Sequence, residues 1–327
     1  MWFFLIIFDT SKTDIVILFS SIDDFDLGSC AVSVGAFDGV HIGHVSVLNY
    51  LFELAQRSNL PSVVLTFKNH PQLFFKMRTD FRLLTTLDEK IELIKEKTNV
   101  DAIVQIPFDA NISTLKYNDF VDKILKTRLR AEKIVMGYNH RFGVGGEGTF
   151  EKVKAFAEKK SIEVYNAPEL YPGEHLSSSR IRKLLFEGNV SHSAKLLGYN
   201  YGFTANVIYG QQLGRKIGFP TVNLQPLSID KLLPLQGVYI VKILIGNQIK
   251  HGILNYGVRP TINNISQPTI EVHIFDFSDV LYDKTIRVEF LERLRSEMKF
   301  NSIDELRSQI KRDKEKAENY LKSVEDK

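Results

Sequence analysis

Two histidines separated by two residues, His41 and His44, are the first side chains in this sequence that could do chemistry. They follow an apolar run at residues 31–37 and open a stretch with helical spacing at residues 42–58. The first amides of a helix lack partners within the helix, and its N-terminus carries a partial positive charge, so this place suits a phosphate. Gly43 lets the backbone approach an anion closely, and both imidazoles can donate to it. An ordinary polar turn remains the alternative for so short a motif.

Three further segments place polar and aromatic side chains at the ends of expected strands or at a helix start. Residues 66–71 end one strand, and residues 137–143 follow another and mix ring-stacking with hydrogen-bonding side chains. Serines at 177–179 precede a helical stretch with arginines one turn in, a combination that can grip a polyphosphate. Plain N-capping is the alternative for the serines, and a structural role is the alternative for His70 and His140.

The second half of the chain contains two more candidates. Residues 214–223 form a glycine-punctuated turn that ends with Thr221 and Asn223, and such hydroxyl and amide oxygens suit a magnesium-bound nucleotide. In the run 269–275, strict alternation places Glu271 on the face opposite Ile270 and Val272. A carboxylate in that position either faces solvent or serves as a general base.

The elements that position the first group of residues alternate between strand and helix. Strand-like runs are expected at 31–37, 62–67, 102–106, 133–136 and 161–164, and helices at 42–58, 87–96, 117–129 and 149–160. This βαβ alternation predicts an α/β domain of Rossmann-like type, with a doubly wound parallel sheet. Ligands of such sheets bind beyond the carboxyl ends of the strands, where His41 and His44 are expected.

The pattern changes after a helical stretch that ends at residue 197. Strands separated by Gly, Pro and Asn turns are expected at 203–209, 237–245, 250–255, 269–275 and 285–291. Their spacing predicts a small antiparallel barrel or sandwich, and residues 303–321 predict an amphipathic helix laid on it. We therefore expect an N-terminal extension at 1–13, a first domain at 14–188 and a second domain at 189–327.

Composition limits the function classes. A length of 327 residues suits two domains, and 44% hydrophobic with 25% charged residues is typical of a globular protein. A net charge of +3 and the lack of a basic face with interleaved aromatic residues predict no nucleic-acid partner. The single cysteine, Cys30, fits a reducing cytoplasm and a packing role. The apolar start is too short to span a membrane, so we expect no membrane partner. For the oligomeric state we expect a monomer or weak homo-oligomer.

Taken together, these motifs resemble the bacterial bifunctional riboflavin kinase/FAD synthetases across residues 14–325. In the first half the matching segments are 35–44, 137–143 and 177–182. In the second half they are 214–223, 255–261, 271–277 and 290–295. Several long motifs in the family's order are far more specific than any one of them.

The resemblance implies two reactions. The C-terminal domain would be a riboflavin kinase that transfers the γ-phosphoryl of ATP to the ribityl 5′-hydroxyl of riboflavin, giving FMN. The N-terminal domain would be an FMN adenylyltransferase that joins FMN to AMP from a second ATP, giving FAD and pyrophosphate. Magnesium would assist, and riboflavin, FMN, FAD and ATP would be substrates or products.

The resemblance also implies roles for individual residues. His41 and His44 would stabilise the transition state on ATP with Arg182, and Glu271 would accept the ribityl proton. Thr221 and Asn223 would bind Mg²⁺. The ATP and phosphate positions that it implies are Gly35, Phe37, Asp38, Gly43, Asn139, Ser178, Ser179, Gly214, Arg215, Gly218, Thr221 and Asn223, and the flavin positions are Phe67, His70, Pro71, Arg293 and Arg295.

This sequence departs from the family pattern in places. Asn69 stands where proline is common, which predicts a looser loop beside the flavin, and residues 144–148 lack the basic residues of relatives. Ser179 replaces threonine, and Gln211 and Gln212 are atypical of the kinase glycine loop. Two alternatives therefore stay open: a riboflavin kinase with a degenerate adenylyltransferase domain, and a flavin- or nucleotide-binding module without turnover. Retained Glu271 speaks against the second, because a binding module has no use for a proton acceptor.

Overall fold

The computed structural model describes residues 16–75, 80–170, 176–210, 214, 217–259, 267–277, 279 and 281–325. It divides the chain into two compact units. The first takes in residues Met1–Phe81 and Leu87–Glu174, and the second takes in Arg82–Thr86 and His175–Lys327. The expected extension at 1–13 lies outside the described residues. Within them, no helix combines the length and the apolar character that crossing a membrane requires.

The first unit is built on a six-stranded sheet in the order β1-β4-β3-β2-β5-β6, with every pair parallel. Its central strands are wholly buried because helices cover both faces, which explains their nearly continuous apolar runs. The expected parallel sheet is confirmed, and β1 is an edge strand that the sequence pattern did not reveal. The strands are β1 (Ile17–Phe19), β2 (Cys30–Gly35), β3 (Ser62–Phe67), β4 (Ala102–Ile106), β5 (Ala131–Met136) and β6 (Glu163–Asn166).

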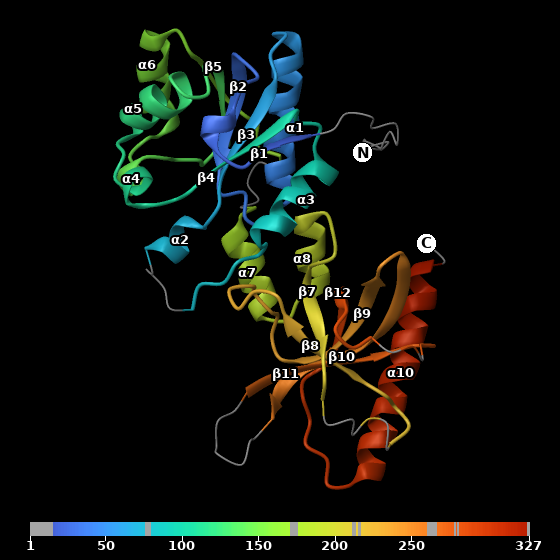
Figure 1. The fold of residues 1–327 in the computed structure, drawn as a ribbon. Helices are drawn as coiled ribbons and strands as arrows, with labels where there is room; N and C mark the ends of the chain where they lie inside the picture. Colours follow the sequence, from blue (N-terminus) through green and yellow to red (C-terminus); the bar gives the residue numbers. More distant parts are fainter. Residues whose placement is uncertain are drawn as a thin grey trace. The chain divides into compact units, whose positions relative to one another are not determined.

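Helices lie on both sides of this sheet, with α1 and α3 on one side and α5 and α6 on the other (Figure 1). The expected helix at 117–129 is short α5 followed by a π-helix at Phe120–Lys126. The helices of the unit are α1 (Ile42–Arg57), α2 (Pro71–Phe74), α3 (Leu87–Lys97), α4 (Ala110–Ser113), α5 (Tyr117–Asp119) and α6 (Phe150–Ala157), with 3-10 turns at Ile22–Asp24, Val144–Gly146 and Glu158–Lys160.

The second unit contains a closed barrel in the order β10-β11-β8-β7-β12-β9, with antiparallel pairs. Alternation along the strands sends one row of side chains inward, as Ile270, Val272 and Ile274 do on β11. The expected antiparallel barrel is confirmed, but β8 was expected as part of a turn. The strands are β7 (Gly202–Ile208), β8 (Val222–Pro226), β9 (Gly237–Ile245), β10 (Gln248–Arg259), β11 (Gln267–Ile274) and β12 (Thr285–Arg295).

Two helices that precede the barrel belong to its core. Ile181 and Leu185 of α7 (Ser178–Phe186) and Val190 of α8 (Val190–Leu197) are fully buried in one cluster with barrel residues. The second unit therefore begins at His175 by packing, upstream of the expected boundary between residues 188 and 189. That boundary stays a prediction for the limits of the two activities.

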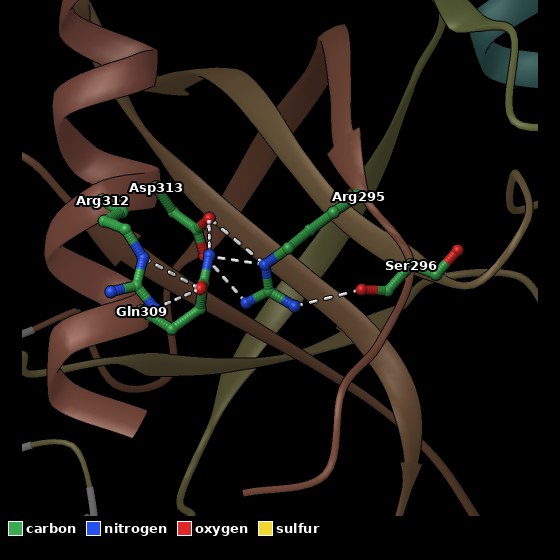
Figure 2. A network of polar contacts seen from close by, with 5 residues as sticks. All are labelled: Arg295, Ser296, Gln309, Arg312 and Asp313. Atoms are coloured by element: carbon green, nitrogen blue, oxygen red, sulfur yellow. Dashed lines mark hydrogen bonds and ion pairs between the residues drawn. The ribbon is translucent and has the colours of Figure 1, made fainter. Parts of the chain in front are cut away.

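The C-terminal helix α10 (Ile303–Glu325) packs on the outside of the barrel, where Ala317 is fully buried (Figure 1). Figure 2 shows the polar contacts that hold it. Arg295 at the end of β12 donates from Nε and Nη2 to Asp313 Oδ2, at 3.0 and 2.7 Å. Gln309 Nε2 donates to Asp313 Oδ1 at 2.8 Å, so the buried carboxylate has partners at both oxygens. These contacts join α10 to the end of β12.

Candidate active sites

The loop between β2 and α1 holds the two histidines in a fixed pair. His41 is the N-cap of α1, and its Nδ1 accepts a hydrogen bond from the His44 backbone N–H at 3.3 Å. The two rings stack with centroids 3.6 Å apart, and Phe37 meets His44 edge-on at 5.4 Å. Among the buried polar side-chain atoms of the described residues, His44 Nδ1 is one that has no hydrogen-bond partner. Such an atom is available to a ligand.

The backbone of this loop is strained. Phe37 and Val40 have φ values of 47° and 35°, and Gly39 has a φ of 84°. Positive φ is costly for the two side-chain-bearing residues, and it persists only where the surroundings fix it. Both of these side chains are buried, and Gly35 permits the fold because a Cβ there would meet the Phe37 ring at 2.9 Å. Strain of this kind is typical of functional loops.

The segment after β5 lies beside the histidine loop. β2 is flanked by β3 on one side and β5 on the other, so the strand order reverses between β2 and β5. At that point an open parallel sheet leaves a crevice for ligands beyond its strand ends. His140 contributes to the lowered pKa of His44, and a Cβ at Gly137 would lie 3.4 Å from Val47 of α1. The structure thus brings the segment at 137–143 and the histidine loop together.

The histidines are neutral at physiological pH. Burial lowers the pKa of His41 to about 4 against the opposing effect of Asp38, and burial lowers the pKa of His140 to about 4. Burial also holds the pKa of His44 well below its usual value, with smaller contributions from His41, His140 and Lys90. Neutral imidazoles donate from one ring nitrogen each.

An aromatic cluster stands at the ends of β3 and β4, beside Phe67. Phe108 contacts Phe67 edge-on at 5.2 Å, and Phe74 and Phe75 both contact Phe108 at 5.6 Å. Asn69 exchanges two hydrogen bonds with the Phe108 backbone, at 2.7 and 2.9 Å. The expectation that Asn69 loosens this loop is therefore wrong, because its amide supplies two cross-links that proline cannot make. Phe74 and Phe75 are 39% and 49% exposed, which leaves ring area for a flat ligand.

His70 and Pro71 begin the short helix α2 in this wall. His70 is the N-cap, and its Nδ1 accepts from the Gln72 N–H at 3.1 Å while its ring lies 4.8 Å from that of Phe81. Its Nδ1 is thus engaged in capping the helix, in agreement with the structural role that was the alternative for His70. Pro71 occupies the first helical turn, where a missing N–H costs nothing.

The serine–arginine segment belongs to the second unit. Ser177 is the N-cap of α7 and accepts from the Arg180 N–H at 3.2 Å, so the capping alternative is confirmed for this serine. Ser178 is half-buried and Ser179 is exposed in the first turn. Arg182 donates from Nε to the Arg82 carbonyl at 2.9 Å.

A polar row crosses the outer face of the barrel. Glu271 on β11 is directly opposite Asn223 of β8 and Asn255 of β10. Paired residues on neighbouring strands project to the same face, and all three side chains are half-buried. Ile270 and Val272 point into the core instead. The row places a carboxylate between two amides, an arrangement that only the register of three strands could reveal.

Glycines let the backbone close on Thr221 and Asn223. A Cβ at Gly214 would lie 3.1 Å from Thr221 Oγ1, and one at Gly210 would overlap the Asn223 side chain. Beside the two oxygen-bearing groups there is therefore no room for a larger residue at positions 210 and 214. Gly218 has a φ of 83°, which favours glycine. Arg215, Gln211 and Gln212 lie outside the described residues.

The two arginines expected to bind flavin differ in their surroundings. Arg295 is committed to Asp313 through three hydrogen bonds. Arg293 donates from Nη2 to the Gln236 carbonyl and to Ser296 Oγ, at 3.0 and 3.1 Å. The structure thus gives both guanidinium groups protein partners.

The remaining expected residues lie in the loop and turns around the first sheet. Asp38 is 4% exposed in the strained loop, Gly43 is in the first turn of α1, and Asn139 is exposed after β5. Cys30 is fully buried with its pKa raised to about 12 by burial, which confirms the packing role. Within the described part of the chain, no cluster of three or more His, Cys, Asp or Glu side chains could hold a metal ion.

Comparison with known proteins agrees with this geometry. A family model for FAD synthetase matches residues 24–181, and one for riboflavin kinase matches residues 197–321. The bifunctional riboflavin kinase/FMN adenylyltransferase of Haemophilus influenzae is 36% identical over 299 residues, which are 91% of this chain and 96% of that protein. The proteins of that name from Escherichia coli K12 and Bacillus subtilis are 34% and 33% identical and cover 89% and 90% of this chain.

A solved structure shares the fold of both units. The crystal structure titled macrolide-efflux protein from Streptococcus pneumoniae has a TM-score of 0.83 and 30% identity, and it covers 93% of this chain and 99% of its own. The two family models match in the expected order, and the relatives match along nearly their whole length. These comparisons agree on one family. This chain belongs to the family of bifunctional riboflavin kinase/FMN adenylyltransferases.

Proposed function

We propose that this chain makes FAD from riboflavin in two steps, phosphorylating riboflavin with ATP and then adenylylating FMN with release of pyrophosphate. The observation that supports the proposal is that each unit has an arrangement of groups suited to phosphate. The first unit has a helix N-terminus with two stacked neutral histidines, and the second has Thr221 and Asn223 beside Glu271.

In the kinase reaction, Glu271 accepts the proton of the ribityl 5′-hydroxyl as that oxygen attacks the γ-phosphorus of ATP, and ADP leaves as the bond to the β,γ-bridging oxygen breaks. Its position opposite Asn223 puts the base beside the residue that would hold the metal. The hydroxyl of Thr221 and the amide oxygen of Asn223 are the hard oxygen donors that Mg²⁺ prefers. When bound, Mg²⁺ neutralises charge on the phosphates. Positioning and a base are the protein's main contributions to phosphoryl transfer.

In the adenylyl step, the FMN phosphate attacks the α-phosphorus of ATP, and pyrophosphate leaves. The attacking phosphate is already an anion at neutral pH, so the protein needs no nucleophile of its own. His41 and His44 donate to phosphate oxygens whose charge grows in the transition state, and the α1 amides support them. The family's pattern also assigns Ser178, Ser179 and Arg182 to ATP phosphates.

The flavin sites and the setting complete the proposal. Phe67 and Phe108 with the exposed rings of Phe74 and Phe75 offer a stacking wall for the isoalloxazine of FMN. A cytoplasmic location is supported by the lone buried cysteine and by the use of ATP. We expect a monomer or weak homo-oligomer.

One assay tests this proposal. The purified chain is incubated with riboflavin, ATP and Mg²⁺, and riboflavin, FMN and FAD are resolved by chromatography. We expect FMN to rise first and FAD to follow. FMN alone would support the alternative of a kinase with a degenerate partner domain. Binding without either product would support a non-catalytic module.

A further inference from the structure

Lys90 is a buried lysine on α3 that lies outside every motif of the two candidate sites. It is 7% exposed, which is rare for a lysine. Its Nζ donates to the Phe67 carbonyl at 2.8 Å, to Thr66 Oγ1 at 3.0 Å and to the Ala36 carbonyl at 3.3 Å. An ammonium has three N–H donors, so these three acceptors use its full capacity.

The three acceptors belong to two neighbouring strand ends. Ala36 opens the loop after β2, and Thr66 and Phe67 close β3. Thr66 Oγ1 donates its own hydrogen to the Gly35 carbonyl at 2.9 Å, which leaves its lone pairs free to accept from Lys90. The ammonium therefore joins Ala36, where the loop that leads to His41 begins, to Phe67, where the aromatic cluster with Phe108 begins.

The residues directly after Ala36 connect this contact to the histidine pair. They are the strained Phe37 to Val40, and His41 comes next. Phe37 contacts the His44 ring, and His44 stacks on His41. A shift at the Ala36 carbonyl would therefore move the ring against which the histidine pair rests.

The charge of Lys90 also interacts with nearby titratable groups. Burial lowers its pKa to about 8, and Asp38 in the strained loop opposes this. Lys90 in turn contributes to the lowered pKa of His44, together with His41 on α1 and His140 after β5. At neutral pH the group is thus a cation that interacts with Asp38 and His44.

We propose that Lys90 is a positioning residue for adenylyl transfer, whose ammonium holds the loop of His41 and His44 and the end of β3 in the reactive geometry. The proposal rests on the assignment of these histidines to the ATP phosphates.

The test compares three variants by FAD formation from supplied FMN, ATP and Mg²⁺ between pH 6 and pH 10. Lys90→Met removes the charge at similar length, and Lys90→Arg keeps a cation that does not titrate in this range. Lys95→Met, on the same helix with 34% of its side chain exposed, is the matched control. FMN formation from riboflavin by the second unit is measured in each preparation as a check on that unit.

For Lys90→Met we expect kcat for FAD formation to fall by about 10²-fold, the usual cost of a displacement near 1 Å, with FMN formation unchanged. In the parent, kcat/KM for ATP should decline above pH 8 as the ammonium loses its proton. This decline should be missing in Lys90→Arg, which should also recover part of the lost kcat. Lys95→Met should behave as the parent.

Three results would overturn the proposal: near-parental FAD formation in Lys90→Met, a decline above pH 8 that persists in Lys90→Arg, or an equal loss in Lys95→Met. Should Lys90→Met fail to fold, the pH profile of Lys90→Arg decides alone. A His41→Ala, His44→Ala double variant separates the two proposals. If the double variant still makes FAD, the assignment of the two histidines is wrong. If the double variant makes no FAD while Lys90→Met remains fully active, only the role of Lys90 is wrong.

Discussion

At the scale of single residues, Glu271 carries the sharpest assignment. Sequence alternation put it opposite Ile270 and Val272, and the burial of those two residues confirms the alternation. The position of Asn223 and Asn255 beside it could not be predicted, because they lie 48 and 16 residues away on other strands. The register between these strands cannot be read from the sequence. The catalytic role is a proposal that substitution can test.

Glu271→Gln preserves the shape of the side chain and removes its basicity. We expect FMN formation to fall by ~10²–10⁴-fold, the usual contribution of a general base. FAD formation from supplied FMN should stay at the parental rate, because that reaction is assigned to the other unit. Both rates are measured by chromatography of the products. Glu315→Gln, an exposed carboxylate on α10, is the control, and near-parental kinase turnover in Glu271→Gln would return Glu271 to a surface role.

The buried histidines predict acid sensitivity of the first unit. Their folded pKa values lie at about 4 for His41 and His140, below the ordinary value of 6.5, so the unfolded chain binds these protons more readily. Stability is therefore full above pH 6.5 and declines as pH falls toward 4, by roughly 1–3 kcal/mol per histidine.

Two measurements check this expectation. Nuclear magnetic resonance titration of the imidazole protons should place the His41 and His140 transitions below pH 5. Urea denaturation should show that His140→Asn loses less stability than the parent between pH 6.5 and pH 4. Ordinary pKa values near 6.5 in the folded chain would contradict it.

At the scale of elements, the sequence predicted those with strong periodicity and missed those that depend on partners. β3, β4 and β9 agree with expectation to the residue because they are apolar runs bounded by Pro61, Pro107 and Gly246. β1 has three residues and is defined by its pairing with β4. β8 was hidden in a glycine turn, because Val222–Pro226 becomes a strand through pairing with β7 and β11. The role of α7 in the barrel core was also missed, since a helix pattern does not say which core it joins.

That role changes what a fragment needs. A fragment of residues 189–327 lacks Ile181 and Leu185, both fully buried in the core of the second unit. We expect a fragment of residues 175–327 to unfold at a clearly higher urea concentration, since removing a buried Ile or Leu side chain typically costs about 2–5 kcal/mol. Circular dichroism during denaturation measures this. Equal midpoints would show that α7 contributes nothing to the barrel and would favour the boundary at 188.

At the scale of the whole molecule, the sequence predicted two domains and their order, because each carries its own motifs. It could not predict that residues 82–86 join the second unit. There Leu83 N donates to the Asp230 carbonyl at 2.7 Å, Leu232 N donates to the Leu83 carbonyl at 2.8 Å, and the buried Lys231 donates to the Leu84 carbonyl at 2.6 Å. Backbone pairing of this kind leaves no trace in local periodicity.

Separate active sites predict complementation between inactive chains. A His41→Ala, His44→Ala variant should make FMN and no FAD, and Glu271→Gln should make FAD only when FMN is supplied. Mixed with riboflavin, ATP and Mg²⁺, the two should form FAD after a lag while free FMN accumulates. A time course by chromatography measures this lag. FAD formation by either chain alone from riboflavin at the parental rate would contradict the division of labour.

The segment Arg82–Thr86 also has a consequence for biosynthesis. It leaves the ribosome about ninety residues before His175, yet it belongs to the unit that begins there. Its backbone partners at 230–232 are synthesised later still. N-terminal domains generally fold first during synthesis, so the nascent first unit has to fold around a five-residue stretch whose partners do not yet exist. This stretch can therefore pair with its partners only after translation has passed residue 232.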